Sequence, residues 1–261
     1  MRIAVIGAAG RMGRLLLGEV LAAEDLELVA ACDRAESGLI GTPAGALVGR
    51  QGGVPLSAVS AEALAAAEVV VDFSLPDGLA ATLDALGGQA LVTGTTGLPA
   101  ALAERLTDRA GVAPVVAAAN FSTGVTLLLD LVERAAHALP DADVEIVETH
   151  HRLKQDAPSG TALALGEAVA DGRAVHLAEV AVHGRSGHTG VRPAGEVGFH
   201  ALRGGDVVGE HQVWLIAQGE RLSLGHVAHS RLTFVMGALR AARWVSGRAP
   251  GRYAMRDVLG L

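Results

Sequence analysis

Two adjacent histidines and a lysine lie within a five-residue stretch in the middle of the chain. They are His150, His151 and Lys154, and the segment after them, QDAPSG, is typical of a loop that leads into a helix. Imidazole and ammonium groups can transfer protons and can bind an anion. The sequence therefore predicts proton transfer on a negatively charged substrate near these side chains.

The residues before the histidines predict how the two rings are oriented. Residues 143–151 read as a strand, in which the even-numbered positions up to His150 share one face and His151 belongs to the other. The two histidines are therefore expected to have different roles. A purely structural role for either ring remains an alternative at this point.

A helix is expected to begin near Ser159 or Gly160, where a polar loop gives way to an apolar pattern. The free main-chain N–H groups of Ser159, Gly160 and Thr161 would form an anion site, for which a carboxylate is the natural ligand. Simple capping by the two hydroxyl side chains is the alternative. No metal is expected, because adjacent histidines are not a typical ligand spacing and no cysteine accompanies them.

A glycine-rich turn stands between the first expected strand, residues 2–7, and the helix after it. Gly7, Gly10 and Gly13 follow the pattern GxxGxxG rather than GxGxxG. Glycines in this position let the main chain approach a pyrophosphate, whose charge a helix N-terminus favours. The turn predicts dinucleotide binding, although a structural turn would need small residues too.

The second expected strand, residues 26–33, ends in a charged pair. Asp33 is 20 positions after Gly13, where a carboxylate that binds the ribose hydroxyls of NAD is expected. Arg34 could instead pair with the 2′-phosphate of NADP. The pair predicts NADH or NADPH as the cofactor; solvated loop charges are the alternative.

Two further loops lie at the carboxyl ends of expected parallel strands. Gly94, Thr95 and Thr96 offer amides and hydroxyls for the nicotinamide ribose or carboxamide, and Asn120 and Phe121 are expected to close over the ring. Each loop by itself could also be an ordinary turn. Their joint placement favours cofactor binding.

The rhythm of the chain predicts an α/β protein of two domains. Strands and helices alternate up to residue 121, which predicts βαβ units and a parallel, Rossmann-type sheet. A long helix, 123–139, then precedes β-like runs, in which GGD and QGE resemble hairpin turns. The β-like runs are 177–185, 196–217 and 220–228, and a tail helix, 231–247, returns to the first domain. The predicted domains are therefore a dinucleotide-binding domain (1–121 and 231–261) and a central α+β domain (122–230). The central domain is expected to contain a mixed, largely antiparallel sheet.

Composition excludes several classes of function. The net charge of −7 disfavours a broad nucleic-acid surface. Cys32 is the only cysteine, which rules out an intramolecular disulfide. No apolar run is long enough to span a membrane or to form the core of a signal peptide, so a cytoplasmic protein is expected.

Six segments together resemble one enzyme family. In order along the chain they are GAAGRMG, VDFSLP, GTTG, ANFSTGV, ETHHRLKQDAPSGTAL and RDVLGL. The chain is similar over nearly its whole length to the dihydrodipicolinate reductases of bacterial lysine biosynthesis. The resemblance implies NAD(P)H-dependent reduction of 4-hydroxy-tetrahydrodipicolinate to tetrahydrodipicolinate in the diaminopimelate pathway. It also implies a homotetramer formed through the central domain.

The resemblance also implies roles for individual residues. His150 would donate or accept a proton and Lys154 would donate one, while the substrate's carboxylates would be held by His151, Ser159, Gly160 and Thr161. The implied cofactor-binding residues are Gly7, Ala8, Ala9, Gly10, Arg11, Met12, Asp33, Arg34, Gly94, Thr95, Thr96, Ala118, Ala119, Asn120 and Phe121. Many members have Glu in place of Asp33, so the preference between NADH and NADPH stays open. Many also have Pro in place of Ala119, which bears on the rigidity of that loop and not on its role.

Two rival functions share part of this pattern. Another two-domain dehydrogenase, such as a homoserine or aspartate dehydrogenase, would share the glycine turn but not HHRLKQDAPSGTA. A non-catalytic dinucleotide sensor would have no reason to keep a proton-donating cluster. Measured turnover separates the sensor from an enzyme.

Overall fold

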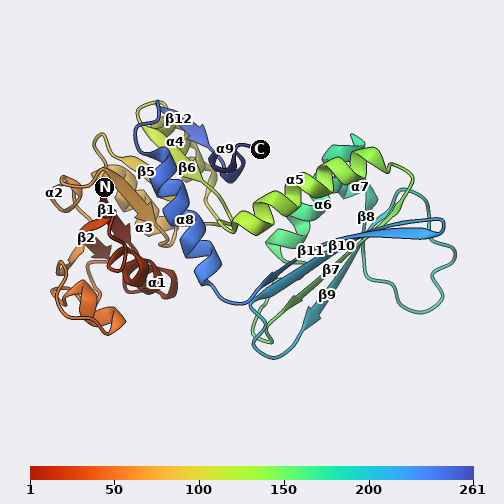
Figure 1. Cartoon of the computed structure of the whole chain (residues 1–261), viewed down its shortest axis with the longest axis horizontal. Coiled ribbons are helices and arrows are strands. Elements are labelled where there is room, and N and C mark those ends of the chain that lie inside the picture. The colour runs from red at the N-terminus through yellow and green to blue at the C-terminus, as the bar shows by residue number, and fades with distance from the viewer. The chain divides into compact units, whose positions relative to one another are not determined.

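The computed structural model describes all 261 residues, and they divide into two compact units. The first unit consists of Met1–Ser122 and Leu232–Leu261, and the second is Thr123–Arg231. Figure 1 shows the elements of both units. None of the helices combines the length and the apolar character that crossing a bilayer requires.

A seven-stranded parallel sheet forms the centre of the first unit. Its short strands are rich in valine and alanine and bury both faces, as expected for parallel strands covered by helices on both sides. The strand order reverses between β1 and β4, which is where sheets of this type bind their ligands. The order is β12 (Gly251–Tyr253), β6 (Pro114–Ala117), β5 (Ala90–Thr93), β4 (Val69–Asp72), β1 (Arg2–Ile6), β2 (Glu27–Asp33), β3 (Leu56–Ala58).

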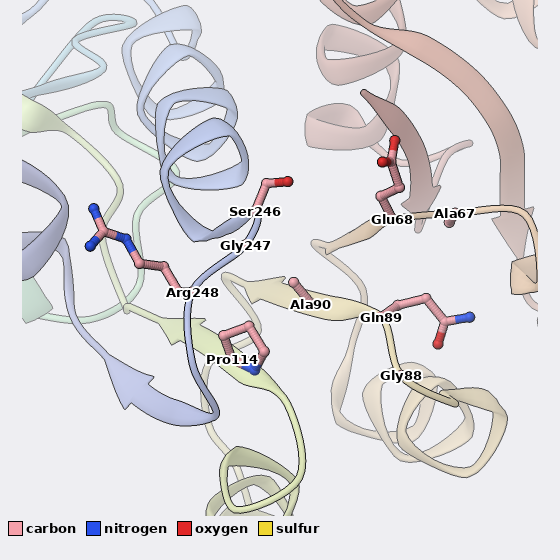
Figure 2. Close-up of a pocket in the computed structure, with 9 residues that line it drawn as sticks. All are labelled: Ala67, Glu68, Gly88, Gln89, Ala90, Pro114, Ser246, Gly247 and Arg248. Carbon is pink, nitrogen blue, oxygen red and sulfur yellow. The ribbon is translucent and has the colours of Figure 1, made fainter.

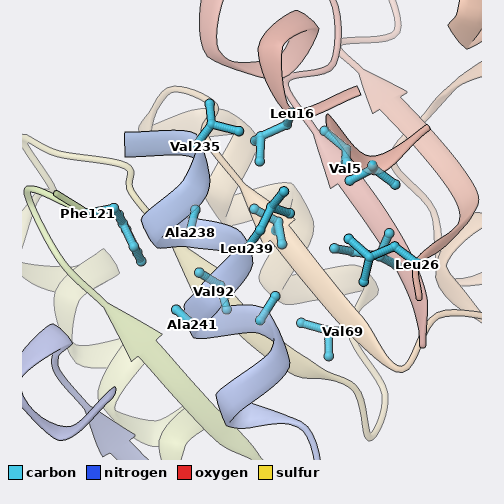
Figure 3. Close-up of a cluster of buried hydrophobic side chains, with 14 of the residues drawn as sticks. Val5, Leu16, Leu26, Val69, Val92, Phe121, Val235, Ala238, Leu239 and Ala241 are labelled. Atoms are coloured by element: carbon cyan, nitrogen blue, oxygen red, sulfur yellow. The ribbon is translucent and has the colours of Figure 1, made fainter. Parts of the chain in front are cut away.

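Two hydrophobic cores lie on the two faces of this sheet. Ile3 and Val5 of β1 point into one core and Ala4 into the other, because side chains alternate along a strand. In the first core Leu239, from the helix near the C-terminus, packs beside Val92 (Figure 3). That face carries α1 (Arg11–Val20), α8 (Leu232–Val245) and α9 (Met255–Leu259); the other carries α2 (Ala61–Leu64), α3 (Pro76–Ala85) and α4 (Ala100–Ala110).

The second unit contains a mixed sheet with helices on one face only. Residues Val144 and Ile146 of the central strand point into the core beneath these helices. The sheet order is β11 (Glu220–Ala228), β10 (Gly209–Ala217), β7 (Asp143–His150), β9 (Val197–Arg203), β8 (Ala181–His183), and the helices are α5 (Thr123–Ala138), α6 (Gly160–Arg173) and α7 (Leu177–Val180). The predicted fold class is confirmed: a Rossmann-type parallel sheet and a second unit with a mixed sheet. This second sheet is not largely antiparallel as predicted, because β9 pairs parallel with both β7 and β8.

One of the two predicted hairpins is wrong. The QGE turn does join β10 and β11, which pair antiparallel with Ala217 opposite Glu220. The GGD segment does not close a hairpin, because β7 lies between β9 and β10. Instead this loop bonds to the end of β7, where Gly204 N–H donates to His150 O and His151 N–H donates to Val207 O. Local turn signals cannot show that a strand from elsewhere is inserted.

The run 177–185 is helical at its start rather than β-like throughout. One turn of helix, Leu177–Val180, precedes the short strand β8. This turn places Leu177 against Gly166 of α6, where an added Cβ would lie 3.1 Å from the methyl groups of Leu177 and 2.4 Å from the ring of Phe199. Short elements without a strong sequence signal, among them β3, β12 and the 3₁₀ turn Ala44–Val48, were not predicted.

Candidate active site

The loops at the carboxyl ends of the parallel strands converge on one aromatic ring. Phe73 follows β4, and a Cβ added to Gly94 after β5 would lie 2.3 Å from its ring. A Cβ on Gly7, which has φ of +72°, would lie 3.0 Å from the carbonyl oxygen of Phe73. Only residues without side chains allow these loops to approach so closely. Two segments predicted to bind the cofactor therefore meet at the switch point of the sheet.

The glycine turn itself is closed by Gly13. A Cβ there would lie 2.0 Å from the carbonyl oxygen of Gly7, so the first turn of α1 packs directly on the preceding loop. Gly10 is the N-cap residue of α1 and is exposed. The turn thus presents a helix N-terminus at the carboxyl edge of the sheet, which fits a pyrophosphate.

Asp33 lies beside this turn. Its carboxylate accepts hydrogen bonds from the N–H groups of Ala9, at 2.8 Å, and of Arg34, at 2.9 Å. A carboxylate has about four lone-pair positions, so it can still accept bonds from two ribose hydroxyls. The structure therefore brings together the two features that the sequence predicted to bind the nucleotide. The exposed Arg34 stands next to them.

A buried carboxylate that was not predicted from the sequence organises the same edge. Asp72, at the end of β4, is fully buried and accepts bonds from Ser74 N, Ser74 Oγ and Thr82 Oγ1. Thr95 Oγ1 also bonds to Asp72, at 3.3 Å, so the predicted GTTG loop is anchored to the loop after β4. The position of VDFS at a strand end is the signal that could have revealed Asp72 and Phe73.

The expectation that Phe121 closes over the nicotinamide ring is not met. Its side chain is 1% exposed and packs in the core, with its ring 5.4 Å from that of Phe73. A ring buried in this way packs under the loop that follows β6 and supports that loop. Asn120 is partly exposed, and its side-chain oxygen accepts a bond from Ser122 N–H, which shapes the loop.

The remaining predicted cofactor residues differ in exposure. Ala8 is buried, whereas Arg11, Thr96 and Ala119 are exposed at the surface. Met12 and Ala118 are intermediate, and both pack at the margin of the first core. All of them belong to the loops or the helix start at this one edge of the sheet, so the donor set fits a dinucleotide.

A hollow in the first unit lies at the other edge of the sheet. It has a volume of about 600 Å³ and is open and polar (Figure 2). Residues from the amino ends of the strands line it, among them Glu68 before β4, Gln89 before β5 and Pro114 in β6, together with Arg248 after α8. This is the edge opposite the glycine turn, so the hollow is not the dinucleotide site.

In the second unit the helix-facing side of β7 ends in a charged cluster. Glu148 is 1% exposed; Nδ1 of His150 bonds to its Oε2 at 2.6 Å, and Arg203 of β9 donates to both of its oxygens, at 2.7 and 2.8 Å. Burial opposes the charged form of Glu148. The bonds from Arg203 and His150 outweigh burial, so the pKa of Glu148 lies below its ordinary value.

The start of α6 joins this cluster. Ser159 is the N-cap residue, and its Oγ accepts the bond from Ala162 N–H. Its own N–H donates to Glu148 Oε1 at 3.1 Å. The prediction that the N–H of Ser159 is free to bind an anion is therefore wrong, because this N–H already donates to the carboxylate of Glu148. Gly160 and Thr161, in the first turn, are more exposed than Ser159 and remain the candidate anion-binding positions.

A third histidine, which was not predicted to belong to the site, lies next to the start of α6. His211 of β10 is 4% exposed, and its Nε2 is 3.1 Å from Ser159 Oγ. Burial, helped by the neighbouring His150, lowers the pKa of His211 to about 4. It is therefore neutral at physiological pH. Only the pairing of β10 with β7 brings it here, which a sequence pattern does not specify.

Lys154 is held at the outer side of the same loop. Its Nζ is 2.9 Å from Asp156 Oδ1, and 21% of its side chain is exposed. The main-chain oxygen of Asp156 accepts a bond from Arg203, which connects this loop to the Glu148 cluster. His151 follows β7 and is partly exposed, with no partner for its buried Nδ1. An ammonium group, two imidazoles and a helix N-terminus suit an anionic substrate that needs a proton.

Comparison with known proteins identifies the family. The model described as "Dihydrodipicolinate reductase, N-terminus" matches residues 1–121, and the one described as "Dihydrodipicolinate reductase, C-terminus" matches residues 124–259. A 4-hydroxy-tetrahydrodipicolinate reductase from Alkalilimnicola ehrlichii is 53% identical, over 100% of this chain and 99% of that protein. One from Thiobacillus denitrificans is 50% identical, with the same coverage.

A solved structure shows the same fold. A dipicolinate-bound dihydrodipicolinate reductase from Paenisporosarcina sp. TG-14 superposes with a TM-score of 0.74, at 24% identity, over 98% of each chain. The family models and the full-length relatives confirm the resemblance inferred from the motifs, and they do not support the homoserine and aspartate dehydrogenase alternative. On the evidence of both halves and of full-length relatives, the chain belongs to the dihydrodipicolinate reductase family.

Proposed function

We propose that this chain reduces 4-hydroxy-tetrahydrodipicolinate to tetrahydrodipicolinate in the diaminopimelate and lysine pathway, with the site residues in the roles given below. The chain is an NAD(P)H-dependent oxidoreductase of its family. The observation that carries the proposal is 53% identity over the whole chain with a reductase named for this reaction. The charged cluster around Glu148 and the glycine turn supply the chemistry that the reaction needs.

The first unit binds the cofactor. The exposed N-terminus of α1 holds the pyrophosphate, Asp33 accepts bonds from the ribose hydroxyls, and Arg34 is placed to pair with a 2′-phosphate. The Asp72 network keeps the loop of Thr95 in place beside them. When bound, the nicotinamide supplies a hydride.

The second unit binds the substrate and handles its proton. The N–H groups of Gly160 and Thr161 and the ring of His151 hold the two carboxylates. Lys154 and His150 supply a proton or positive charge as the C=N group accepts the hydride, because a cation nearby stabilises the electron-rich transition state. Ser159 shapes this site through its capping bond and does not itself hold the substrate by its N–H.

The test is turnover in a coupled assay. A synthase makes the cyclic substrate from pyruvate and aspartate semialdehyde, and oxidation of NADH and NADPH is followed separately. Oxidation that depends on both synthase substrates supports the proposal. No oxidation with either cofactor, in folded protein that binds NADH, would instead favour the non-catalytic sensor.

Replacing Asp33 by Ala is expected to weaken NADH binding by about tenfold and NADPH binding by less, because a hydrogen bond to a charged group contributes about 1.5–3 kcal/mol. Dissociation constants from fluorescence titration of both cofactors measure this. Asp33 also holds Ala9 N–H, so Asp33→Asn, which keeps an acceptor for that bond, is the matched control. A parallel loss of both cofactors in Asp33→Ala would contradict the ribose assignment.

We further propose that the chain forms a homotetramer and works in the cytoplasm, as a biosynthetic reductase like its relatives. The face of the second sheet that no helix covers carries the apolar side chains of Leu202, Ile216 and Val227, which are 49%, 36% and 44% exposed. Leu202 and Val227 lie towards one end of the strands and Ile216 towards the other, so apolar side chains are exposed along this face. Exposed apolar side chains on an uncovered face favour association with copies of the same chain.

Replacing Ile216 by Arg is expected to reduce the assembly, because a charge would be buried where this face of the sheet meets another copy of the chain. Light scattering coupled to gel filtration should give about four times 26.5 kDa for the unaltered chain and a lower mass for the variant. Val112→Arg is the control, since Val112 is 68% exposed but belongs to the first unit. Equal masses for all three proteins would place the interface elsewhere.

A further inference from the structure

We propose that Glu148 is a positioning residue that fixes the tautomer of His150, and that Arg203 locks Glu148 in place. The inference rests on the proposed function in one respect, that His150 exchanges a proton with the substrate. It adds which nitrogen does so and which residues determine this. The carboxylate, the imidazole and the guanidinium come from two neighbouring strands whose register places His150 opposite Arg203.

The distance between His150 and Glu148 determines where the ring hydrogen is. Nδ1 lies 2.6 Å from Glu148 Oε2. With its pKa held below the ordinary value, Glu148 is ionised near neutral pH and can only accept hydrogen bonds. Nδ1 must therefore carry the hydrogen. In the neutral ring Nε2 is then the atom with the free lone pair, and it is the atom that gains or loses the proton.

The surroundings of Nε2 agree with this assignment. Nε2 has no hydrogen-bond partner, and it is not among the enclosed ring nitrogens, which belong to other histidines. It lies beside Gly209, where an added Cβ would be 3.0 Å away. The side chain of His150 as a whole is 11% exposed. One nitrogen is thus tied to a carboxylate and the other is left open.

Arg203 makes the orientation of Glu148 unique. It binds both carboxylate oxygens in the bidentate arrangement that matches a planar guanidinium to a carboxylate. Ser159 N–H donates to one of the oxygens as well, so each oxygen accepts two bonds. Rotation of the carboxylate would break several of these bonds in a buried place. The ring of His150 is therefore held by a rigid partner.

The direct test is nitrogen NMR of the unaltered protein. The ¹⁵N signals of His150, assigned from their absence in His150→Gln, should show a protonated, pyrrole-type Nδ1 and an unprotonated, pyridine-type Nε2 when the ring is neutral. This measurement needs no activity and no variant at position 148. A neutral ring with its hydrogen on Nε2 would overturn the inference.

The kinetic test uses two similar carboxylates on opposite faces of β7. Glu148→Gln keeps the shape but no longer requires an N–H from the ring, so kcat should fall at least about tenfold, as is typical when the partner that orients a functional histidine is lost. Glu145 lies on the other face and is bonded to Arg185, Arg192 and His200. Glu145→Gln is the matched control and should leave kcat unchanged.

The outcomes separate the inference from the function that it rests on. If Glu148→Gln is folded by circular dichroism, keeps its NADH affinity and loses kcat while its neutral His150 populates both tautomers, the inference holds. If Glu148→Gln keeps full kcat, or if its His150 keeps the tautomer of the parent protein, the inference is wrong. Full activity in His150→Gln would instead overturn the proposed role of His150, whatever its tautomer.

Discussion

Replacing Lys154 by Ala should lower kcat by roughly 10²–10⁴-fold, the usual contribution of a positioned acid or base. NADH affinity should stay nearly unchanged, because no predicted cofactor residue lies in the second unit. Lys154 is the one lysine of the chain, and its Nζ lies beside the loop that leads into α6. Its loss removes both a proton source and a positive charge next to a dicarboxylate. Steady-state kinetics and fluorescence titration of NADH measure the two quantities.

Two further variants show which property of Lys154 matters. Lys154→Arg keeps the charge but cannot give up a proton, because the guanidinium pKa is too high. Recovery of kcat in this variant would indicate charge stabilisation, and no recovery would indicate proton transfer. Asp156→Asn tests the ion pair alone; Asp156 is 62% exposed, so only a small change is expected. Equal losses of kcat and NADH affinity in Lys154→Ala would contradict the assignment of Lys154 to the substrate site.

Local patterns in the sequence predicted the parts of the fold that depend on near neighbours. The alternation of residues 143–151 separated the two faces of β7 and put Glu148 and His150 on the same side, which the structure shows to be the buried one. The change from polar loop to apolar pattern placed the start of α6 at Ser159 or Gly160, and the helix begins at Gly160. Periodicity and capping are properties of a few adjacent residues, so one sequence suffices to find them.

The features of the site that were not predicted depend on pairing between strands that are distant in the sequence. Arg203 and His211 reach the site only because β9 and β10 flank β7 in a particular register. The GGD segment looks like a hairpin turn locally, yet its strands are separated by a third one. The hydrogen bond of the Ser159 N–H was missed for the same reason, because its acceptor, Glu148, is 11 residues away in the sequence and is brought to it only by the fold. Long-range register is not encoded in any short window.

The pairing that brings His211 into the core also predicts a loss of stability in acid. The pKa of His211 is lowered from 6.5 to about 4 in the folded chain, mainly by burial. Between these two values the unfolded chain takes up a proton that the folded chain does not. Stability therefore falls as the pH drops from 6.5 towards 4, by up to about 3 kcal/mol in total for this group. Below pH 4 the group contributes no further change.

His211→Gln is expected to lack this loss, because a glutamine side chain can reach Ser159 Oγ and does not titrate. Nδ1 of His211 has no partner, so the substitution leaves no other bond unmade. Urea unfolding at pH 7 and at pH 4.5, followed by the fluorescence of Trp214 in a Trp244→Phe background, measures both stabilities. The parent should lose about 2 kcal/mol more than the variant between the two pH values. The carboxylates that do not interact with His211 also lose their contribution in acid, but they do so in both proteins, so that part cancels in the difference. Glu148 does interact with His211, so the difference reports the buried imidazole together with this interaction. Identical losses in the two proteins would mean that folded His211 is protonated as readily as the unfolded residue, and that its burial carries no penalty for the charge.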